Sequence, residues 1–131
     1  MNKNNLILYA VILIFGLVAP FVFPAFKVQL SILCVLIILA DPNWPEAWNK
    51  RATVLYMLGR YQESQKDINE VLKLEKRHFG ALSGQGLVQT ELKNYEKAIN
   101  SYIEVQKIYP AMQAPKVMIP RLKELIKGQS T

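Results

Sequence analysis

The stretch EAWNKRATVLYMLGRYQESQKDINEVLKLE, residues 46–75, decides the fold of this chain. Shifted by 34 residues, it matches GALSGQGLVQTELKNYEKAINSYIEVQKIY, residues 80–109, with Ala47 on Ala81 and Tyr61 on Tyr95 among the identical pairs. A fixed period of this length is typical of stacked helical hairpins, because one hairpin cannot bury its apolar face without a neighbour. This part of the chain is therefore predicted to be an all-α solenoid with a surface suited to binding other proteins.

Each period contains two amphipathic helices. The pattern predicts helices over Pro45–Leu58 and from Tyr61 in the first period, and over Ala81–Leu92 and Tyr95–Ile108 in the second. Small side chains recur at matching positions and allow the paired helices to approach closely: Ala52, Ser64, Gly86 and Ala98. Large side chains are expected to fill the gaps between hairpins: Trp48, Tyr61, Tyr95 and Tyr102.

These positions resemble the signature of the tetratricopeptide repeat family over residues 41–112. The matching residues are Ala47, Trp48, Ala52, Gly59, Tyr61, Ser64, Val71 and Leu72, then Ala81, Leu82, Gly86, Tyr95, Ala98, Tyr102, Val105 and Pro110. Arg51 and Gln85 depart from it, because the family favours a leucine there. The resemblance implies two antiparallel helix-turn-helix repeats, residues 45–78 and 79–112, followed by a capping helix and tail over residues 113–131.

The resemblance also implies a binding site. In this family the first helix of each hairpin lines a concave groove that binds extended peptides. Carried over by position, the groove residues are Asn49, Thr53, Tyr56, Met57, Ser83, Leu87, Thr90 and Glu91. Asn49 and Thr53 are expected to bond a peptide backbone, and apolar contacts come from three others: Tyr56, Met57 and Leu87. The basic clamp that some members use for carboxylate termini has no counterpart, since Ser83 and Leu87 stand at its positions.

Residues 1–40 are sequence of a different kind. Lys27 is the only charged residue from Leu6 to Ala40, and Leu6–Phe23 is long enough to span a bilayer. Val28–Ala40 reaches spanning length only by recruiting its neighbours. We therefore expect residues 6–40 to attach the chain to a membrane as one helix or as a helical hairpin. A third interpretation, a cleaved signal peptide, is disfavoured because a second apolar run follows directly.

Positive charge after the apolar region favours the hairpin, with the repeats on the cytoplasmic side of a bacterial inner membrane. Residues 17–24, LVAPFVFP, and 29–33, QLSIL, also resemble the opening helices of bacterial branched-chain amino-acid transporter permeases. That resemblance leaves an alternative open. The chain would then be a chimeric or truncated product that joins a permease start to a partial repeat domain and has no independent activity.

Two repeats are fewer than the ~3 that normally make a stable stack. Pro115, Met118, Leu122 and Leu125 predict a capping helix within residues 113–127, and Pro120 should kink or shorten it. Upstream, Pro42 is in phase with Pro110, but Ile7–Leu39 shows none of the signature. The outer edge of the first hairpin, near Trp44 and Trp48, therefore needs a cover. The bilayer, the second apolar stretch and another protein are all possible covers.

The remaining features of the sequence indicate neither catalysis nor binding of nucleic acid, metal or cofactor. The net charge of +6 comes with no nucleic-acid motif, and no arrangement of residues indicates an enzyme, a metal site, a cofactor or a small-molecule substrate. Cys34 is expected to face lipid or another helix, and His78 to cap a helix end. Gly80, Gly84 and Gly86 indicate close helix packing. The sequence thus predicts a membrane-anchored scaffold that binds a protein or peptide partner.

Overall fold

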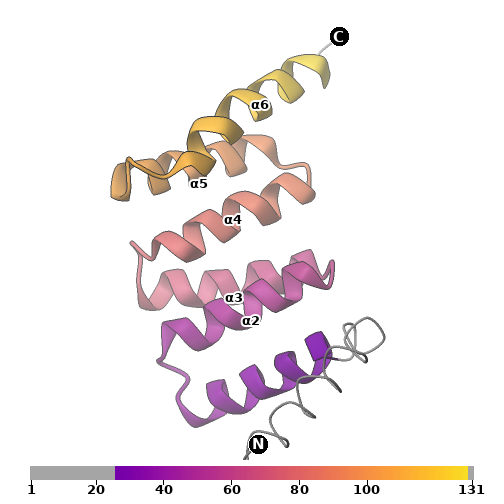
Figure 1. Cartoon of the computed structure of the whole chain (residues 1–131), viewed down its shortest axis with the longest axis vertical. Helices are drawn as coiled ribbons and strands as arrows, with labels where there is room; N and C mark the ends of the chain where they lie inside the picture. The colour runs from indigo at the N-terminus through magenta and orange to yellow at the C-terminus, as the bar shows by residue number, and fades with distance from the viewer. Residues whose placement is uncertain (1–25, 130–131) are drawn as a thin grey trace, which may run out of the picture.

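The structure, a computed structural model, describes residues 26–129. These residues form no strand, and their helices are α2 (Pro45–Met57), α3 (Tyr61–Leu74), α4 (Phe79–Glu91), α5 (Tyr95–Ile108) and α6 (Gln113–Gln129). A helix over residues 26–40 precedes them. The helices stack along the long axis, with residues 26–40 at one end and α6 at the other (Figure 1). The all-α solenoid with its two antiparallel hairpins is confirmed.

Local sequence explains the helix boundaries. Pro45 is the first residue of α2, where its fixed φ suits a helix and its missing N–H costs nothing. Gly59 ends the same helix with φ +73°, a left-handed conformation that favours glycine. The matching residue one period later is Lys93, which has φ 60°. The same turn therefore closes both hairpins, with a less suitable residue in the second.

All six helices share one register. α2, α4 and α6 begin 34 residues apart, as do α3 and α5. One period upstream of α3 falls on residues 27–40, which are helical. Within residues 26–129 the stack thus contains as many helices as three complete repeats, although two of these repeats show the signature. The predicted capping helix occupies the place of a third repeat's first helix, and residues 26–40 occupy the place of an earlier repeat's second helix.

The second apolar stretch covers the outer edge of the first hairpin. Of the three possible covers (the bilayer, this stretch and another protein), the structure therefore shows the second. Cys34 and Ile38 are each only 5% exposed, and Cys34 faces another helix as expected. Lys27 donates from Nζ to the carbonyl of Met57 at 3.4 Å, at the end of α2 where backbone carbonyls favour a cation. The charge that interrupts the apolar run therefore helps to hold residues 26–40 against α2.

None of the helices within residues 26–129 has both the length and the apolar character to cross a membrane. Leu6–Phe23, the stretch expected to span, lies outside the described residues.

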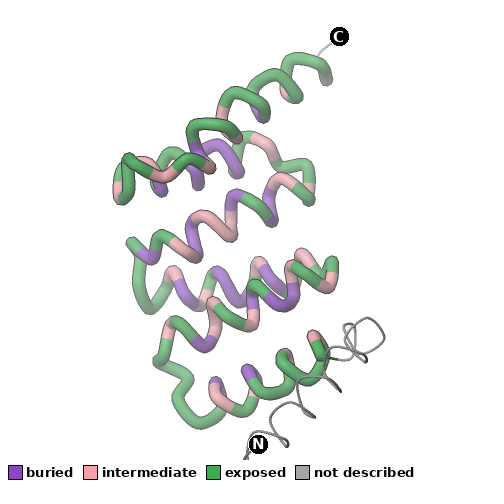
Figure 2. The backbone as a smooth tube through the Cα atoms, viewed as in Figure 1, coloured by how far each residue is buried: buried purple, intermediate pink, exposed green. Residues whose placement is uncertain are grey.

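Buried residues occur on every helix of the stack (Figure 2), and most of the buried apolar ones belong to two clusters. The first joins α2, α3 and α4 and consists of Ala52, Ile68, Val71, Ala81 and Val88. The second joins α5 and α6 and consists of Ala98, Ile99, Tyr102 and Leu122. Close approach is confirmed at Gly86, one of the predicted small residues, since a Cβ there would lie 2.6 Å from the ring of Tyr102.

Pro120 does not shorten α6, so that part of the prediction is wrong. The helix continues to Gln129, although proline removes one backbone hydrogen bond. Leu122 is fully buried in the second core cluster, and Met118 and Ile126 pack against it from either side along the chain. Packing before and after the proline keeps the helix in one piece.

Candidate functional site

The eight groove residues predicted from the sequence lie on α2 and α4, two first helices of hairpins that contact each other. Half of them are partly buried: Asn49, Tyr56, Ser83 and Thr90. The others are exposed: Thr53, Met57, Leu87 and Glu91. Each helix therefore offers two partly buried and two exposed side chains at matching positions, so the two rows have the same profile.

One direct contact joins the two rows. The hydroxyl of Tyr56 donates to Oε1 of Glu91 at 3.5 Å, a long hydrogen bond between α2 and α4. The ring of Tyr56 also lies 5.5 Å from that of Tyr61, centroid to centroid. Burial, followed by the charge of Glu91, raises the pKa of Tyr56. Tyr56 therefore remains a neutral donor at physiological pH.

The two threonines are less available than the sequence suggested. Thr53 donates from Oγ1 to the carbonyl of Asn49 at 3.0 Å, and Thr90 donates to the carbonyl of Gly86 at 2.7 Å. Both donors are thus engaged within their own helices. The hydroxyl oxygen of Thr53, which is exposed, can still accept a hydrogen bond, so a peptide N–H is the group that it suits.

His78 links the two hairpins. Its Nδ1 accepts the backbone N–H of Ala81 at 3.0 Å at the start of α4, which confirms the predicted helix-end cap. That acceptor role assigns the proton to Nε2, which donates to Oε1 of Glu46 on α2 at 2.9 Å. This hydrogen bond is the main cause that lowers the pKa of Glu46. Glu46 could not be predicted as part of this link, because nothing in its local sequence pattern identifies a partner 32 residues away.

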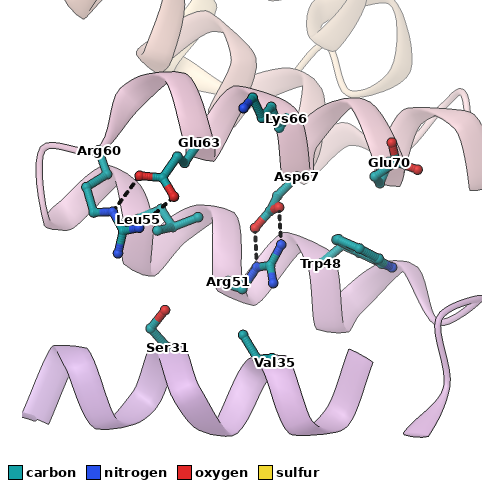
Figure 3. Close-up of a pocket in the computed structure, with 10 residues that line it drawn as sticks. All are labelled: Ser31, Val35, Trp48, Arg51, Leu55, Arg60, Glu63, Lys66, Asp67 and Glu70. Atoms are coloured by element: carbon teal, nitrogen blue, oxygen red, sulfur yellow. Dashed lines mark hydrogen bonds and ion pairs between the residues drawn. The ribbon is translucent and has the colours of Figure 1, made fainter. Parts of the chain in front are cut away.

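A separate crevice opens where residues 26–40 meet the first hairpin (Figure 3). It has a volume of about 560 Å³ and is lined by Ser31, Val35, Trp48, Arg51, Leu55, Arg60, Glu63, Lys66, Asp67 and Glu70. Arg51 makes two hydrogen bonds to Asp67, of 2.6 and 2.5 Å, and its guanidinium lies 5.0 Å from the centre of the Trp48 ring. The hydrogen bonds to Asp67 raise the pKa of Arg51 further.

A matching crevice lies one period later and is smaller, about 260 Å³. It is lined by Leu82, Gln85, Gln89, Lys97, Asn100, Ser101 and Glu104. Gln89 donates to Gln65 of α3 at 2.7 Å and so ties the second hairpin to the first. At the corresponding places the larger crevice has Leu55 and Ser31, which make no such link. The departures of Arg51 and Gln85 from the repeat signature were the only sequence signal for these crevices.

Within residues 26–129, no three His, Cys, Asp or Glu side chains lie close enough together to hold a metal ion.

Comparison with known proteins identifies the repeats. A family model described as tetratricopeptide repeat matches residues 45–78, and a second with the same description matches residues 80–112. A TPR repeat-containing protein of Rhizobium etli is 35% identical over 94 residues, which are 72% of this chain and 46% of that protein. This chain therefore spans about half the length of that relative. These matches do not test the permease resemblance of residues 17–33, which stays a prediction.

Solved structures share the arrangement of helices. The first TPR domain of Spaghetti (RPAP3), bound to the HSP90 peptide SRMEEVD, has a TM-score of 0.77 at 16% identity, over 88% of this chain and 92% of that one. The second TPR domain of human RPAP3, in complex with the HSP70 peptide SGPTIEEVD, has a TM-score of 0.71 at 18% identity, over 80% and 88%. At such identities the likeness establishes the fold.

Proposed function

Because the chain belongs to the tetratricopeptide repeat family, we propose that it is an adaptor that binds an extended segment of a partner protein across α2 and α4. The proposal rests on the matching rows of residues on these two packed helices. Met57 and Leu87 are 58% and 39% exposed, so each row presents an apolar side chain to a ligand. Asn49 and Ser83 add polar groups at matching positions nearby. The peptide-bound neighbours support the same mode of binding.

A pair of matched substitutions tests this proposal. Leu87→Glu places a charge in the middle of the predicted groove, whereas Ile103→Glu places it on α5 at a similar exposure, 39% against 36%. We expect Leu87→Glu to abolish co-purification of the native partner with the tagged chain, and Ile103→Glu to leave it unchanged. Equal recovery with both variants would show that partners bind elsewhere.

We also propose that residues 6–40 attach the adaptor to the bacterial inner membrane, with the repeats on the cytoplasmic side. The support is the outer face of the helix over residues 26–40. Its exposed apolar residues are Phe26, Val28, Leu30, Ile32, Leu33, Leu36 and Leu39, from 37% to 74% exposed. Tethering of this kind raises the effective concentration of an adaptor near membrane-bound partners.

Membrane attachment has its own test. Separation of cell membranes from soluble protein should place the full chain with the membranes, and Leu36→Asp with Leu39→Asp should move part of it to the soluble fraction. Ile103→Asp serves as the control. Protease added to right-side-out vesicles should leave residues 45–131 intact. Digestion from the outer face would place the repeats on the other side of the membrane.

A further inference from the structure

We infer that the crevice between residues 26–40 and the first hairpin binds the phosphodiester group of a membrane phospholipid. The side chains that would donate hydrogen bonds to it are Ser31, Arg51, Arg60 and Lys66. This inference rests on the proposed membrane attachment, and it adds a lipid-binding site with its own residues.

The helix over residues 26–40 carries an exposed apolar stripe at positions that are polar in the other second helices of the stack. The stripe, from 50% to 74% exposed, consists of Val28, Ile32, Leu36 and Leu39. One period later the same positions of α3 hold Gln62, Lys66, Glu70 and Lys73. Two periods later those of α5 hold Glu96, Asn100, Glu104 and Lys107. A side of the stack that is polar on two helices and apolar on the third fits contact of that third helix with lipid acyl chains.

The crevice opens directly beside this apolar stripe. At about 100° per residue, Ser31 and Val35 lie between the buried pair Cys34 and Ile38 and the stripe. The opposite wall includes Lys66 of α3, whose position in the register is that of Ile32 in the stripe. When the stripe contacts acyl chains, the crevice therefore lies at the level of the polar headgroups.

The arginines of the crevice still have hydrogen-bond donors to offer. Arg51 bonds Asp67 through Nε and Nη2, and Arg60 bonds Glu63 in the same way. Nη1 of each guanidinium takes no part in these bonds and carries two N–H donors. Both guanidinium groups extend towards the helix over residues 26–40, from which Ser31 points back across the crevice (Figure 3). The two walls thus present donors to the space between them.

The crevice also has one positive charge in excess. Its third carboxylate, that of Glu70, is paired with Lys73 at 2.5 Å. Within residues 26–129, neither Lys66 nor Ser31 makes a hydrogen bond or an ion pair. A phosphodiester carries one negative charge and its charged oxygens only accept hydrogen bonds, so it matches these donors. The volume of about 560 Å³ lies within the range of small-ligand sites.

Titration of the purified full chain with a short-chain lipid tests the inference in mild non-ionic detergent. Trp44→Phe leaves Trp48, which lines the crevice, as the single tryptophan and fluorescent reporter. We expect dihexanoylphosphatidylglycerol to change the fluorescence of Trp48 with saturation, and uncharged dihexanoylglycerol and inorganic phosphate to leave it unchanged. No saturable change, or an equal response to dihexanoylglycerol, would overturn the inference. An equally tight response to inorganic phosphate would assign the crevice to a soluble anion and overturn the lipid site.

A matched pair of substitutions separates a site from a general effect of charge. Lys66→Gln should weaken binding of dihexanoylphosphatidylglycerol about fivefold, as expected for one basic side chain beside a lipid headgroup. Lys97→Gln removes the same charge from an equally unpaired, exposed lysine of the smaller crevice, and should change binding less than about twofold. Equal losses in the two variants would refute a site at Lys66.

The failure of this inference is distinct from the failure of membrane attachment. A full chain that fractionates with membranes but binds no lipid in the crevice would refute the headgroup site alone. A full chain recovered in the soluble fraction would refute the attachment from which the inference starts.

Discussion

The first hairpin (α2 and α3) and the second (α4 and α5) share one backbone register but fill the same positions with different pairs of residues. Ala52 and Ile68 belong to one buried cluster in the first, and Gly86 lies against Tyr102 at the matching positions of the second. Arg51 pairs with Asp67 in the first, and Gln85 accepts a hydrogen bond from Ser101 at 2.9 Å in the second. Arg51 and Gln85 depart from the repeat signature, and each is paired with a polar residue on the second helix of its own hairpin. The departures are therefore halves of matched pairs.

The helices that flank the hairpins differ in another way. α6 turns charged residues outward beside its apolar ones: Lys116, Arg121, Lys123, Glu124 and Lys127. The helix over residues 26–40 turns an almost entirely apolar face outward, with Leu39 74% exposed. Terminal helices of a solenoid need a polar outer face to remain soluble alone. The two ends of the stack are therefore not equivalent, and the end at residues 26–40 is the one that needs a further contact.

The largest loss of stability is expected for substitutions in the helix over residues 26–40. Ile38→Asp would place an unpaired charge in a buried contact with the first hairpin, and we expect it to lower the free energy of unfolding by about 4 kcal/mol. Leu39→Asp alters the next residue, which is 74% exposed, and should change stability by less than about 0.5 kcal/mol. Denaturant unfolding of both variants in mild detergent makes the comparison. Equal losses would mean that residues 26–40 are not packed as described.

The next largest loss of stability distinguishes the charged pair of the first hairpin from the neutral pair of the second. Arg51→Met leaves Asp67 buried without its partner, because that side chain is only 3% exposed, and should cost about 3 kcal/mol. Gln85→Met removes only a neutral hydrogen bond to Ser101 and should cost about 1 kcal/mol. The midpoint of denaturant unfolding reports both values.

A double substitution controls for side-chain size in that experiment. Arg51→Met combined with Asp67→Leu removes the ion pair together with its burial cost, so much of the lost stability should return. If the double variant were as unstable as Arg51→Met alone, the unpaired carboxylate would not be the cause.

The third effect concerns the apolar pairs. Gly86→Ala brings a Cβ to 2.6 Å from the Tyr102 ring and should destabilise the chain by about 2 kcal/mol. Gly84→Ala is the control, since its Cβ would lie at an ordinary 3.6 Å from Ile68. Adding Tyr102→Ile to Gly86→Ala installs the pair of the first hairpin in the second. That double variant should recover part of the loss in thermal unfolding, and no recovery would mean that the two pairs are not interchangeable.

The 34-residue period was enough to predict both hairpins, because its signal is spread over many positions. The start of α3 at Tyr61 and the bounds of α5, Tyr95–Ile108, were predicted to the residue. The start of α4 was predicted two residues late, at Ala81 instead of Phe79, because the imidazole of His78 caps the helix earlier than its apolar pattern begins. The groove residues were carried over by position and remain a prediction, since no bound partner defines them.

Residues 26–40 show why the packing between separate helices could not be predicted. Their composition alone indicates a membrane segment, and only two side chains, Cys34 and Ile38, are buried against the first hairpin. A contact made by so few residues leaves no periodic signal among uniformly apolar neighbours. The link from His78 to Glu46 and the pair of Arg51 with Asp67 were missed for a similar reason, because pairings between separate helices follow from the three-dimensional arrangement.

The smallest effect separates the turns that close the two hairpins. Lys93 adopts φ 60° at the position where the first hairpin has Gly59, and both turns contain equivalent backbone hydrogen bonds, from Gly59 to Tyr56 at 2.9 Å and from Lys93 to Thr90 at 3.0 Å. A left-handed conformation strains a residue that has a Cβ, and Lys93→Gly removes this strain from the folded state. Glycine also gives the unfolded chain more conformational freedom, which opposes the gain. Because the strain is the larger of the two effects, Lys93→Gly should stabilise the chain by up to about 1 kcal/mol. Gly59→Ala should destabilise it by a similar amount, about 1 kcal/mol. Paired denaturant titrations measure both, and a loss of stability in Lys93→Gly would mean that the side chain of Lys93 makes a contact worth more than its strain.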